Sequence, residues 1–213
     1  FDSGPIISLT MNNLLWILEP LKKRFKGNFI IPDSVYYELV ERPLKIKKYE
    51  YEAIQISKMI ENGIFDVATS NKSERDNLLK YANSSFTCKG RNMKIIQDAE
   101  MDVIALSEET AVIDERTVRL LIEDPWDLRN LLEKRLHSDV QLNANSIKEF
   151  NKMVGVQIIR SSELVSAAYS VGLLKEMVPR LKNGKQVLLD AVLWGLKSVG
   201  CAITQDEIDE IKS

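Results

Sequence analysis

Short apolar runs alternate with longer segments of helical periodicity along the chain, and this alternation constrains the fold more than any other feature of the sequence. Strands that alternate with helices favour an α/β fold, with a mostly parallel sheet covered by helices. Phe1 and Asp2 resemble the last residues of one strand. The further expected strands are residues 28–31, 64–69, 111–114 and 156–160.

Helical periodicity and end signals predict the helices between these strands. Gly63 is expected to end one of them as a C-cap, and Thr204 with Glu207 forms a capping-box pattern at the last. Residues 71–91 are polar and less regular. The expected helices are residues 5–9, 12–25, 33–42, 45–62, 97–109, 115–122, 161–172, 184–200 and 204–212, with one or two more inserted within 123–153.

The chain has 213 residues, enough for one domain with an appendage. We expect a domain over residues 1–172, with the helical insertion at about 123–153, and a helical C-terminal extension over 173–213 packed on it.

Cys88 and Cys201 lie far apart in the chain, and neither belongs to a metal-binding motif. No long apolar stretch or signal peptide is present, so a cytoplasmic protein that does not insert into membranes is expected.

The charges are nearly balanced overall, with a net charge of −2, but they are unevenly distributed. Residues 19–48 carry eight Lys/Arg against four Asp/Glu, residues 72–94 carry six against two, and residues 98–124 carry nine acids against two arginines. Cations beside carboxylates suit the hydrolysis of a polyanion with bound metal. Solvated helix faces are the alternative.

Asp2 and Asp114 come directly after expected strands. Ligands of a parallel sheet bind beyond the carboxyl ends of its strands, so these two acids are candidate ligands for a metal. As an alternative, Asp114 would be the N-cap of the following helix.

Glu38 lies three residues after Val35, so it borders the buried stripe of its helix. A carboxylate held near the core needs a metal or a partner, and Arg42 at i+4 is the alternative partner.

The segment QDAEMDVIAL offers three acids on one expected helix. Glu100 lies at the edge of the inward face and is the first choice as a metal ligand, while Asp102 is the second because it is expected to project further toward solvent. Asp98 suits an N-cap or a first-turn acid.

Four segments in this order resemble the PIN-domain nucleases, in particular a prokaryotic branch close to the ribonuclease toxins of toxin-antitoxin pairs. DSGPIISL resembles the family's opening Asp-Ser/Thr and apolar helix, and IPDSVYYEL its Pro-x-x-Val-x-x-Glu. AEMDVIALS resembles its Gly-Glu-Ala-Glu-Ala-Ile-Ala-Leu-Ala, and DERTVR its Asp-Asp/Glu-Arg-x-x-Arg. GVQIIRSSELVSAAYSVGLL resembles its closing strand and helix. Ala99 replaces a family glycine, and the insertion at 123–153 separates the acids from the closing strand.

The resemblance implies a PIN-like fold and a metal-dependent endoribonuclease that leaves a 5′-phosphate and a 3′-hydroxyl. Mg²⁺ or Mn²⁺ is the implied cofactor, since hard cations prefer oxygen ligands. Single-stranded RNA is the implied substrate, and a homodimer and an antitoxin protein are implied partners. Ser3, Arg116 and Arg119 would contact the substrate, the arginines alternatively forming surface ion pairs. The implied catalytic residues are Asp2, Glu38, Glu100 and Asp114, with Asp102 as a further metal ligand.

Other candidates receive less support from the residues. His137, the only histidine, lies at an apparently solvated helix end. Phe86, followed by CKGRNMK, is a candidate RNA contact. A non-catalytic RNA-binding or complex-forming PIN-like module is the main alternative function. A phosphohydrolase on a different α/β fold is disfavoured because DSG lacks the second Asp of the usual phosphatase opening.

Overall fold

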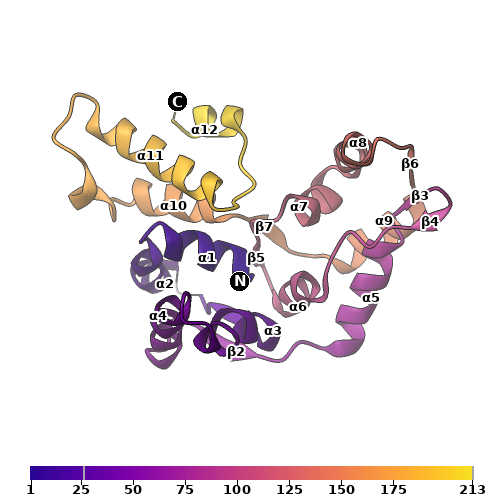
Figure 1. Cartoon of the computed structure of the whole chain (residues 1–213), viewed down its shortest axis with the longest axis horizontal. Coiled ribbons are helices and arrows are strands. Elements are labelled where there is room, and N and C mark those ends of the chain that lie inside the picture. Colours follow the sequence, from indigo (N-terminus) through magenta and orange to yellow (C-terminus); the bar gives the residue numbers. More distant parts are fainter. Residues whose placement is uncertain (26, 213) are drawn as a thin grey trace.

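The computed structural model describes residues 1–25 and 27–212 and has a mixed α/β fold in which short strands lie among helices (Figure 1). Short 3₁₀ turns occur at Leu15–Ile17, Pro43–Lys45 and Lys175–Met177, and a π-helical turn, η2, at Tyr37–Glu41. The α-helices are α1 (Ser3–Met11), α2 (Leu18–Phe25), α3 (Asp33–Tyr36), α4 (Glu50–Glu61), α5 (Lys72–Asn83), α6 (Asp98–Leu106), α7 (Arg116–Glu123), α8 (Pro125–Leu136), α9 (Ala144–Met153), α10 (Ser161–Ser170), α11 (Gly184–Ser198) and α12 (Gln205–Lys212).

Two pairs of parallel strands form the centre of the fold. β1 (Ile30–Pro32) pairs with β2 (Asp66–Ala68), and β5 (Thr110–Val112) pairs with β7 (Gln157–Ile159). The first two residues of the chain lie between the pairs: the nitrogen of Phe1 donates to the Ile30 carbonyl at 2.6 Å, and that of Asp2 donates to the Val112 carbonyl at 2.9 Å. Phe1 and Asp2 therefore join the two pairs in the order β2, β1, Phe1–Asp2, β5, β7.

A separate antiparallel sheet has the strand order β4 (Arg91–Asn92), β3 (Phe86–Cys88), β6 (Val140–Leu142). The sequence did not predict it. Residues 71–91 contain a regular helix and a strand instead of irregular structure, and a strand lies between the two helices of the 123–153 insertion. These strands have only two or three residues and include Thr87, Asn92 and Gln141, so no apolar run marks them.

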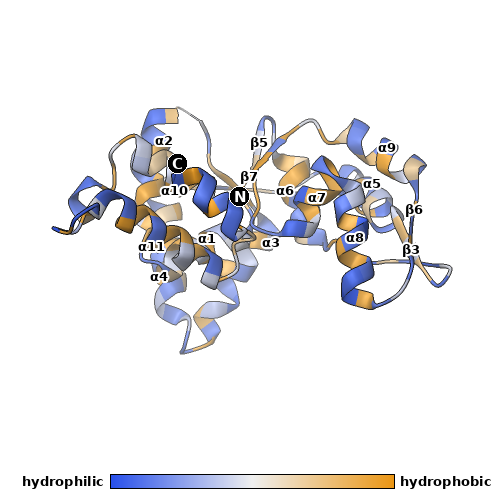
Figure 2. Cartoon of the chain, turned by 90° about the horizontal axis from the view of Figure 1, so that it is seen from above, coloured by the Kyte–Doolittle hydropathy of each residue, from blue (hydrophilic) through white to orange (hydrophobic). Residues whose placement is uncertain are grey.

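The chain extends in one direction, with different elements at its two sides. Figures 1 and 2 both place α1, α4, α10 and α11 on one side and α5, α8 and α9 with the antiparallel sheet on the other, with β5 and β7 between them. Residues near the N-terminus therefore lie close to the middle of the molecule.

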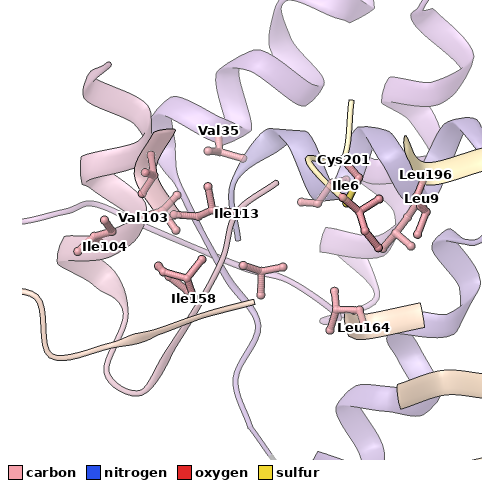
Figure 3. Packing of buried hydrophobic residues seen from close by; sticks show 14 of the residues in the cluster. Ile6, Leu9, Val35, Val103, Ile104, Ile113, Ile158, Leu164, Leu196 and Cys201 are labelled. Atoms are coloured by element: carbon pink, nitrogen blue, oxygen red, sulfur yellow. The ribbon is translucent and has the colours of Figure 1, made fainter. Parts of the chain in front are cut away.

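One hydrophobic core runs through both sides, because buried side chains from all of these helices belong to a single cluster. Figure 2 shows the alternating polar and apolar faces of the helices that produce it. Figure 3 shows part of the core, in which the labelled side chains are Ile6, Leu9, Val35, Val103, Ile104, Ile113, Ile158, Leu164, Leu196 and Cys201.

Several local predictions can be compared with the helix ends. Gly63 has a φ of 71° directly after the last residues of α4, as expected of a glycine at a helix C-terminus. Residues 45–62 do not form one helix: a 3₁₀ turn begins at Pro43, and α4 begins only at Glu50. Extended backbone at Ile46 interrupts the helical path, which amphipathic periodicity alone does not reveal.

The C-terminal helices pack on the end of the sheet and on each other. The Ala202 nitrogen donates to the Asp114 carbonyl at 3.1 Å. The predicted capping box at α12 is confirmed, since Glu207 N donates to Thr204 Oγ1 at 3.1 Å and Thr204 N donates to Glu207 Oε2 at 2.7 Å. Lys212 pairs with Asp190 of α11 at 2.6 Å. Within the described ranges, no helix is long and apolar enough to cross a membrane.

Candidate functional site

Asp2 and Asp114 both lie beside Gly4 at the start of α1. Asp2 is the N-cap of this helix and accepts a hydrogen bond from the Gly4 nitrogen at 3.3 Å. A Cβ atom at Gly4 would lie 3.3 Å from Asp2 Oδ2 and 3.5 Å from Asp114 Cβ. The absence of a side chain at this position thus lets the two acid-bearing segments approach, at the edge where β5 ends.

Asp114 is buried, with 4% of its surface exposed, and both of its carboxylate oxygens accept hydrogen bonds. Ser8 Oγ donates to Oδ2 at 2.7 Å, Ser161 N donates to Oδ1 at 2.7 Å, and Ser161 Oγ donates to Oδ2 at 2.8 Å. The carboxylate joins α1, β5 and α10. It does not cap the following helix, because Glu115 is the N-cap of α7 and accepts from Val118 N at 3.0 Å.

Glu38 lies in η2 with its side chain exposed. It lines a cavity of about 370 Å³ whose wall is mainly apolar and comes from α1, η2 and α4. Arg42 and Glu52 are charged side chains of the same wall. The alternative ion pair between Glu38 and Arg42 is not formed, although both residues are among those the structure describes.

Glu100 is half-buried in the first turn of α6 and accepts a hydrogen bond from the Gln97 nitrogen at 3.0 Å. Gln97 and Glu100 form a capping box. Asp98 is exposed in the same first turn, so the prediction that it is a first-turn acid is confirmed. Glu100 therefore has a local structural role in addition to any role as a ligand.

The expectation that Asp102 projects toward solvent is wrong, because only 6% of this residue is exposed. Ser34 Oγ donates to its carboxylate at 2.7 Å, Ser70 Oγ donates to it as well, and Arg75 lies 3.7 Å away. Ser34 and Ser70 follow β1 and β2. Helical periodicity around α6 does not reveal this, since the groups that cover Asp102 come from distant segments.

The electrostatics of the site show that several of these carboxylates act on one another. Burial, together with the charge of Glu38, raises the pKa of Asp2 above its usual value. Burial and the charges of Asp2 and Glu115 raise the pKa of Glu100. The carboxylates therefore interact near the sheet edge, although the backbone nitrogens of Ser3 and Gly4 and the N-terminal amine favour the ionised form of Asp2.

Carboxylate oxygens are the donors that Mg²⁺ and Mn²⁺ prefer, so the chemistry of the side chains fits such an ion. In the part of the chain that the structure describes, however, no three His, Cys, Asp or Glu side chains are gathered so that they could hold one. Hydrogen bonds within the fold are part of the reason that the carboxylates are not gathered. Gln97 binds Glu100, and Ser8 and Ser161 bind Asp114.

The candidate substrate-binding residues differ in how freely they could contact a substrate. Ser3 is half-buried at the start of α1, beside Asp2. Arg116 lies 3.5 Å from Asp127, with 39% of its side chain exposed. Arg119 is largely covered and donates to Glu207 at 3.0 Å, so both arginines form the ion pairs that were the alternative to substrate contact.

A second network, around Arg160, lies next to the acids. Arg160 follows β7, is 6% exposed, and donates to Glu163, Glu207 and the Ala202 carbonyl. Burial disfavours ionisation of Glu207, but the Thr204 nitrogen and the cations Arg119 and Arg160 outweigh it and lower the pKa of Glu207 to about 2. This network fastens α12 to the carboxyl end of the sheet.

Sequence reasoning missed the hydroxyl groups that hold the acids. Four serines donate to Asp114 or Asp102, and three of them follow strands. Serine two positions after the end of a short apolar run, as in IPDS, VATS and IIRSS, is the signal that could have identified these three. They are Ser34, Ser70 and Ser161, and the fourth is Ser8 in α1.

Comparison of the chain with protein-family models, with curated proteins and with solved structures finds no match.

Proposed function

We propose that the chain is a metal-dependent endoribonuclease of the PIN type whose acidic site lies at the carboxyl end of the parallel strands. The observation that carries this proposal is that Asp2 and Asp114, 112 positions apart in the sequence, both lie beside Gly4, at the edge where ligands of parallel sheets bind. The charge of Glu38 raises the pKa of Asp2, and the charge of Asp2 raises the pKa of Glu100. These interactions support a shared site.

In this proposal, Asp2, Glu38, Glu100 and Asp114 hold Mg²⁺ or Mn²⁺, with Asp102 fixing the adjoining loops. A bound ion of this kind would lower the pKa of a water molecule and neutralise charge on the leaving oxygen. The chain's own contribution is to gather carboxylates and to orient the RNA backbone. Ser3 would donate a hydrogen bond to a phosphate oxygen, and Arg116, whose side chain is partly exposed beside Asp127, would contact the backbone.

The test is cleavage of 5′-labelled single-stranded RNA in the presence of Mn²⁺. Glu38→Gln is the sharpest variant because Glu38 is exposed and removing its charge disturbs no internal hydrogen bond. We expect the cleavage rate to fall by about a hundredfold or more. Glu41→Gln, an exposed acid of the same turn, is the matched control and should cleave like the parent. Equal rates for the two variants would contradict the assignment of the site.

Asp114→Asn is a less specific test. Asp114 accepts three internal hydrogen bonds, so its substitution affects both the fold and any bound ion. Loss of activity in this variant supports the proposal only if the unfolding temperature remains close to that of the parent.

A non-catalytic RNA-binding or complex-forming module is the second candidate, and one observation favours it. Asp114 and Glu100 are both engaged in hydrogen bonds within the fold, so these acids have structural roles that require no ion. This candidate predicts RNA binding without cleavage, unchanged by Mn²⁺. The homodimer and the antitoxin partner remain predictions, and the mass of the purified protein in solution tests the first of them.

A further inference from the structure

The chain between Asp76 and Asp98 carries cations and no carboxylates. Its four charged residues are Lys80, Lys89, Arg91 and Lys94. Charge of a single sign therefore accumulates in this segment, although the charges of the whole chain nearly balance. The segment contains the last part of α5 and both strands of the β3–β4 hairpin.

Strand register places Lys89 and Arg91 at the end of the antiparallel sheet where β6 begins, and a second basic segment lies a few residues before β6 in the chain. Cys88 pairs with Arg91 on one side and with Val140 on the other, so the hairpin turn and the start of β6 lie at the same end of the antiparallel sheet. α8 ends at Leu136, four residues before β6, with Lys134 and Arg135 in its last turn. We call Lys89, Arg91, Lys134 and Arg135 together the basic end of this sheet.

All four side chains of the basic end are exposed. Among the described residues, none of the four forms a salt bridge within 4.0 Å. Of the two acids nearest in the chain, Glu133 is bound to Arg129 and to the Val140 nitrogen, which leaves Asp139 as the other neighbouring carboxylate. The basic end thus has a surplus of positive charge that the protein does not neutralise.

Phe86 does not contribute to this surface, contrary to the expectation from sequence. It is fully buried, so it cannot stack on a base, and it instead anchors the hairpin to the core. Without an exposed aromatic side chain of the hairpin, the surface can recognise the charge of a nucleic acid but offers no base-stacking platform.

We propose that the basic end of the β4–β3–β6 sheet binds the phosphate backbone of single-stranded RNA, outside the acidic site. This inference rests on the proposed function insofar as RNA is the ligand. It adds a second contact region, on the other side of the molecule from the α1–α4 side, and it assigns a role to the insertion that separates the acids from β7.

The length of α5, which lies in the chain between the Asp102-binding loop and the hairpin, gives a length scale for an RNA that could contact both regions. α5 begins two residues after Ser70, which donates to Asp102 at the strand ends, and it ends three residues before β3. Its 12 residues span about 18 Å at 1.5 Å per residue. At a rise of about 3.4 Å per stacked nucleotide, RNA needs roughly five nucleotides to extend over this distance.

The experiment measures binding of a fluorescein-labelled, 20-nucleotide single-stranded RNA by anisotropy at several salt concentrations. The double variant Lys89→Gln/Arg91→Gln is preferred over changes at Lys134 and Arg135, which also interact favourably with the C-terminus of α8. We expect Kd to rise about tenfold at 0.1 M salt, and the slope of log K against log salt to fall by about 1.4 for two lost phosphate contacts.

Arg180→Gln/Lys182→Gln is the matched control. It removes the same two charges from an exposed segment before α11, where neither residue is part of the basic end. The proposal would be overturned if Lys89→Gln/Arg91→Gln changed Kd and the salt slope only as much as this control does. An equally large loss of affinity for poly-glutamate would also overturn it, because the surface would then select acidic polymers without regard to RNA.

RNA length provides an independent readout. The ratio of Kd between variant and parent should grow as the RNA is lengthened beyond about five nucleotides, and the same ratio for four nucleotides would contradict the two-region arrangement. Binding is measured in the Glu38→Gln background, which is expected to cleave about a hundredfold or more slowly than the parent. If the parent proves unable to cleave RNA while binding still depends on Lys89 and Arg91, the proposed function fails and this inference stands.

Discussion

Ser8 Oγ donates a hydrogen bond of 2.7 Å to Asp114 Oδ2, a residue 106 positions later in the chain. The bond joins the first helix to the end of β5 inside the protein, where neither side chain is exposed. Asp114 therefore does not simply present a carboxylate to solvent. It is held by neutral hydroxyl and amide donors, which fix its position at the sheet edge.

Removing the hydroxyl of Ser161 should destabilise the protein. Ser161→Ala eliminates the donor to Asp114 Oδ2 in a fully buried position, and we expect the free energy of unfolding to fall by about 1–3 kcal/mol. Urea denaturation measures this change. Ser170→Ala is the control, because Ser170 bonds only the carbonyl of Ser166 at an exposed position, and it should change stability by less than about 0.5 kcal/mol.

Neutralising Asp2 should stabilise the protein at pH 7. Burial raises the pKa of Asp2, so the folded state favours the protonated carboxyl; this contribution is present at low pH and is lost as the pH rises through the folded-state value. Asp2→Asn keeps the ability to cap α1 and removes the disfavoured charge. We expect a higher unfolding temperature than the parent at pH 7 and no difference at acid pH.

The parent and Asp2→Asn can also be compared by the effect of Mn²⁺ on their unfolding temperatures. If Asp2 helps to hold the ion, Mn²⁺ should raise the unfolding temperature of the parent and have little effect on Asp2→Asn. The exposed Asp139→Asn variant should respond to Mn²⁺ like the parent. A parent protein whose unfolding temperature is insensitive to millimolar Mn²⁺ would argue against the metal site and for the non-catalytic module.

Protonation of Glu207 should destabilise the protein as the pH falls. Hydrogen bonds and the arginine charges lower its pKa from an ordinary value of 4.5 to about 2, so its contribution is present above about pH 4.5 and is lost as the pH falls toward 2. Glu207→Gln should lower the unfolding temperature at pH 6 and flatten its fall between pH 4.5 and 2. Asp206→Asn, an exposed neighbour, should keep the parent's slope.

The close approach of α11 to the end of α1 makes Gly195 sensitive to substitution. A Cβ there would lie 2.2 Å from Asn12 Oδ1, while Asn12 Nδ2 donates to the Ser8 carbonyl at 2.8 Å. We expect Gly195→Ala to destabilise the protein by about 1 kcal/mol. In an Asn12→Ala background the clash is absent, so the same change should stabilise it by about 0.5–1 kcal/mol through helix propensity. The same sign in both backgrounds would contradict this account.

Much of the secondary structure could be predicted because local signals determine it. The capping box of Thr204 and Glu207 and the left-handed Gly63 both depend on residues a few positions apart. The β3, β4 and β6 strands could not be predicted, because each is two or three residues long and is formed through pairing with residues up to about fifty positions away. Short strands acquire stability from partners, not from their own apolar pattern.

In the candidate site, too, the sequence predicted some features and missed others. Sequence position after a strand identified Asp2 and Asp114, and the structure brings both to Gly4. The expectation that Asp102 on α6 projects toward solvent was wrong, since helical periodicity assigns an inward face only relative to neighbours in the same helix. Ser34 and Ser70 cover Asp102 from other parts of the chain.

The sequence by itself determined the alternation of strands and helices and the placement of acids after strands, because both depend on the conformational preferences of neighbouring residues. Only the tertiary structure decided which carboxylates are buried, which are bound by serines, and which cations remain unpaired on the antiparallel sheet. Those properties arise from contacts between segments up to 106 residues apart, and the energy of a buried charge depends on the groups around it rather than on its own position in the chain.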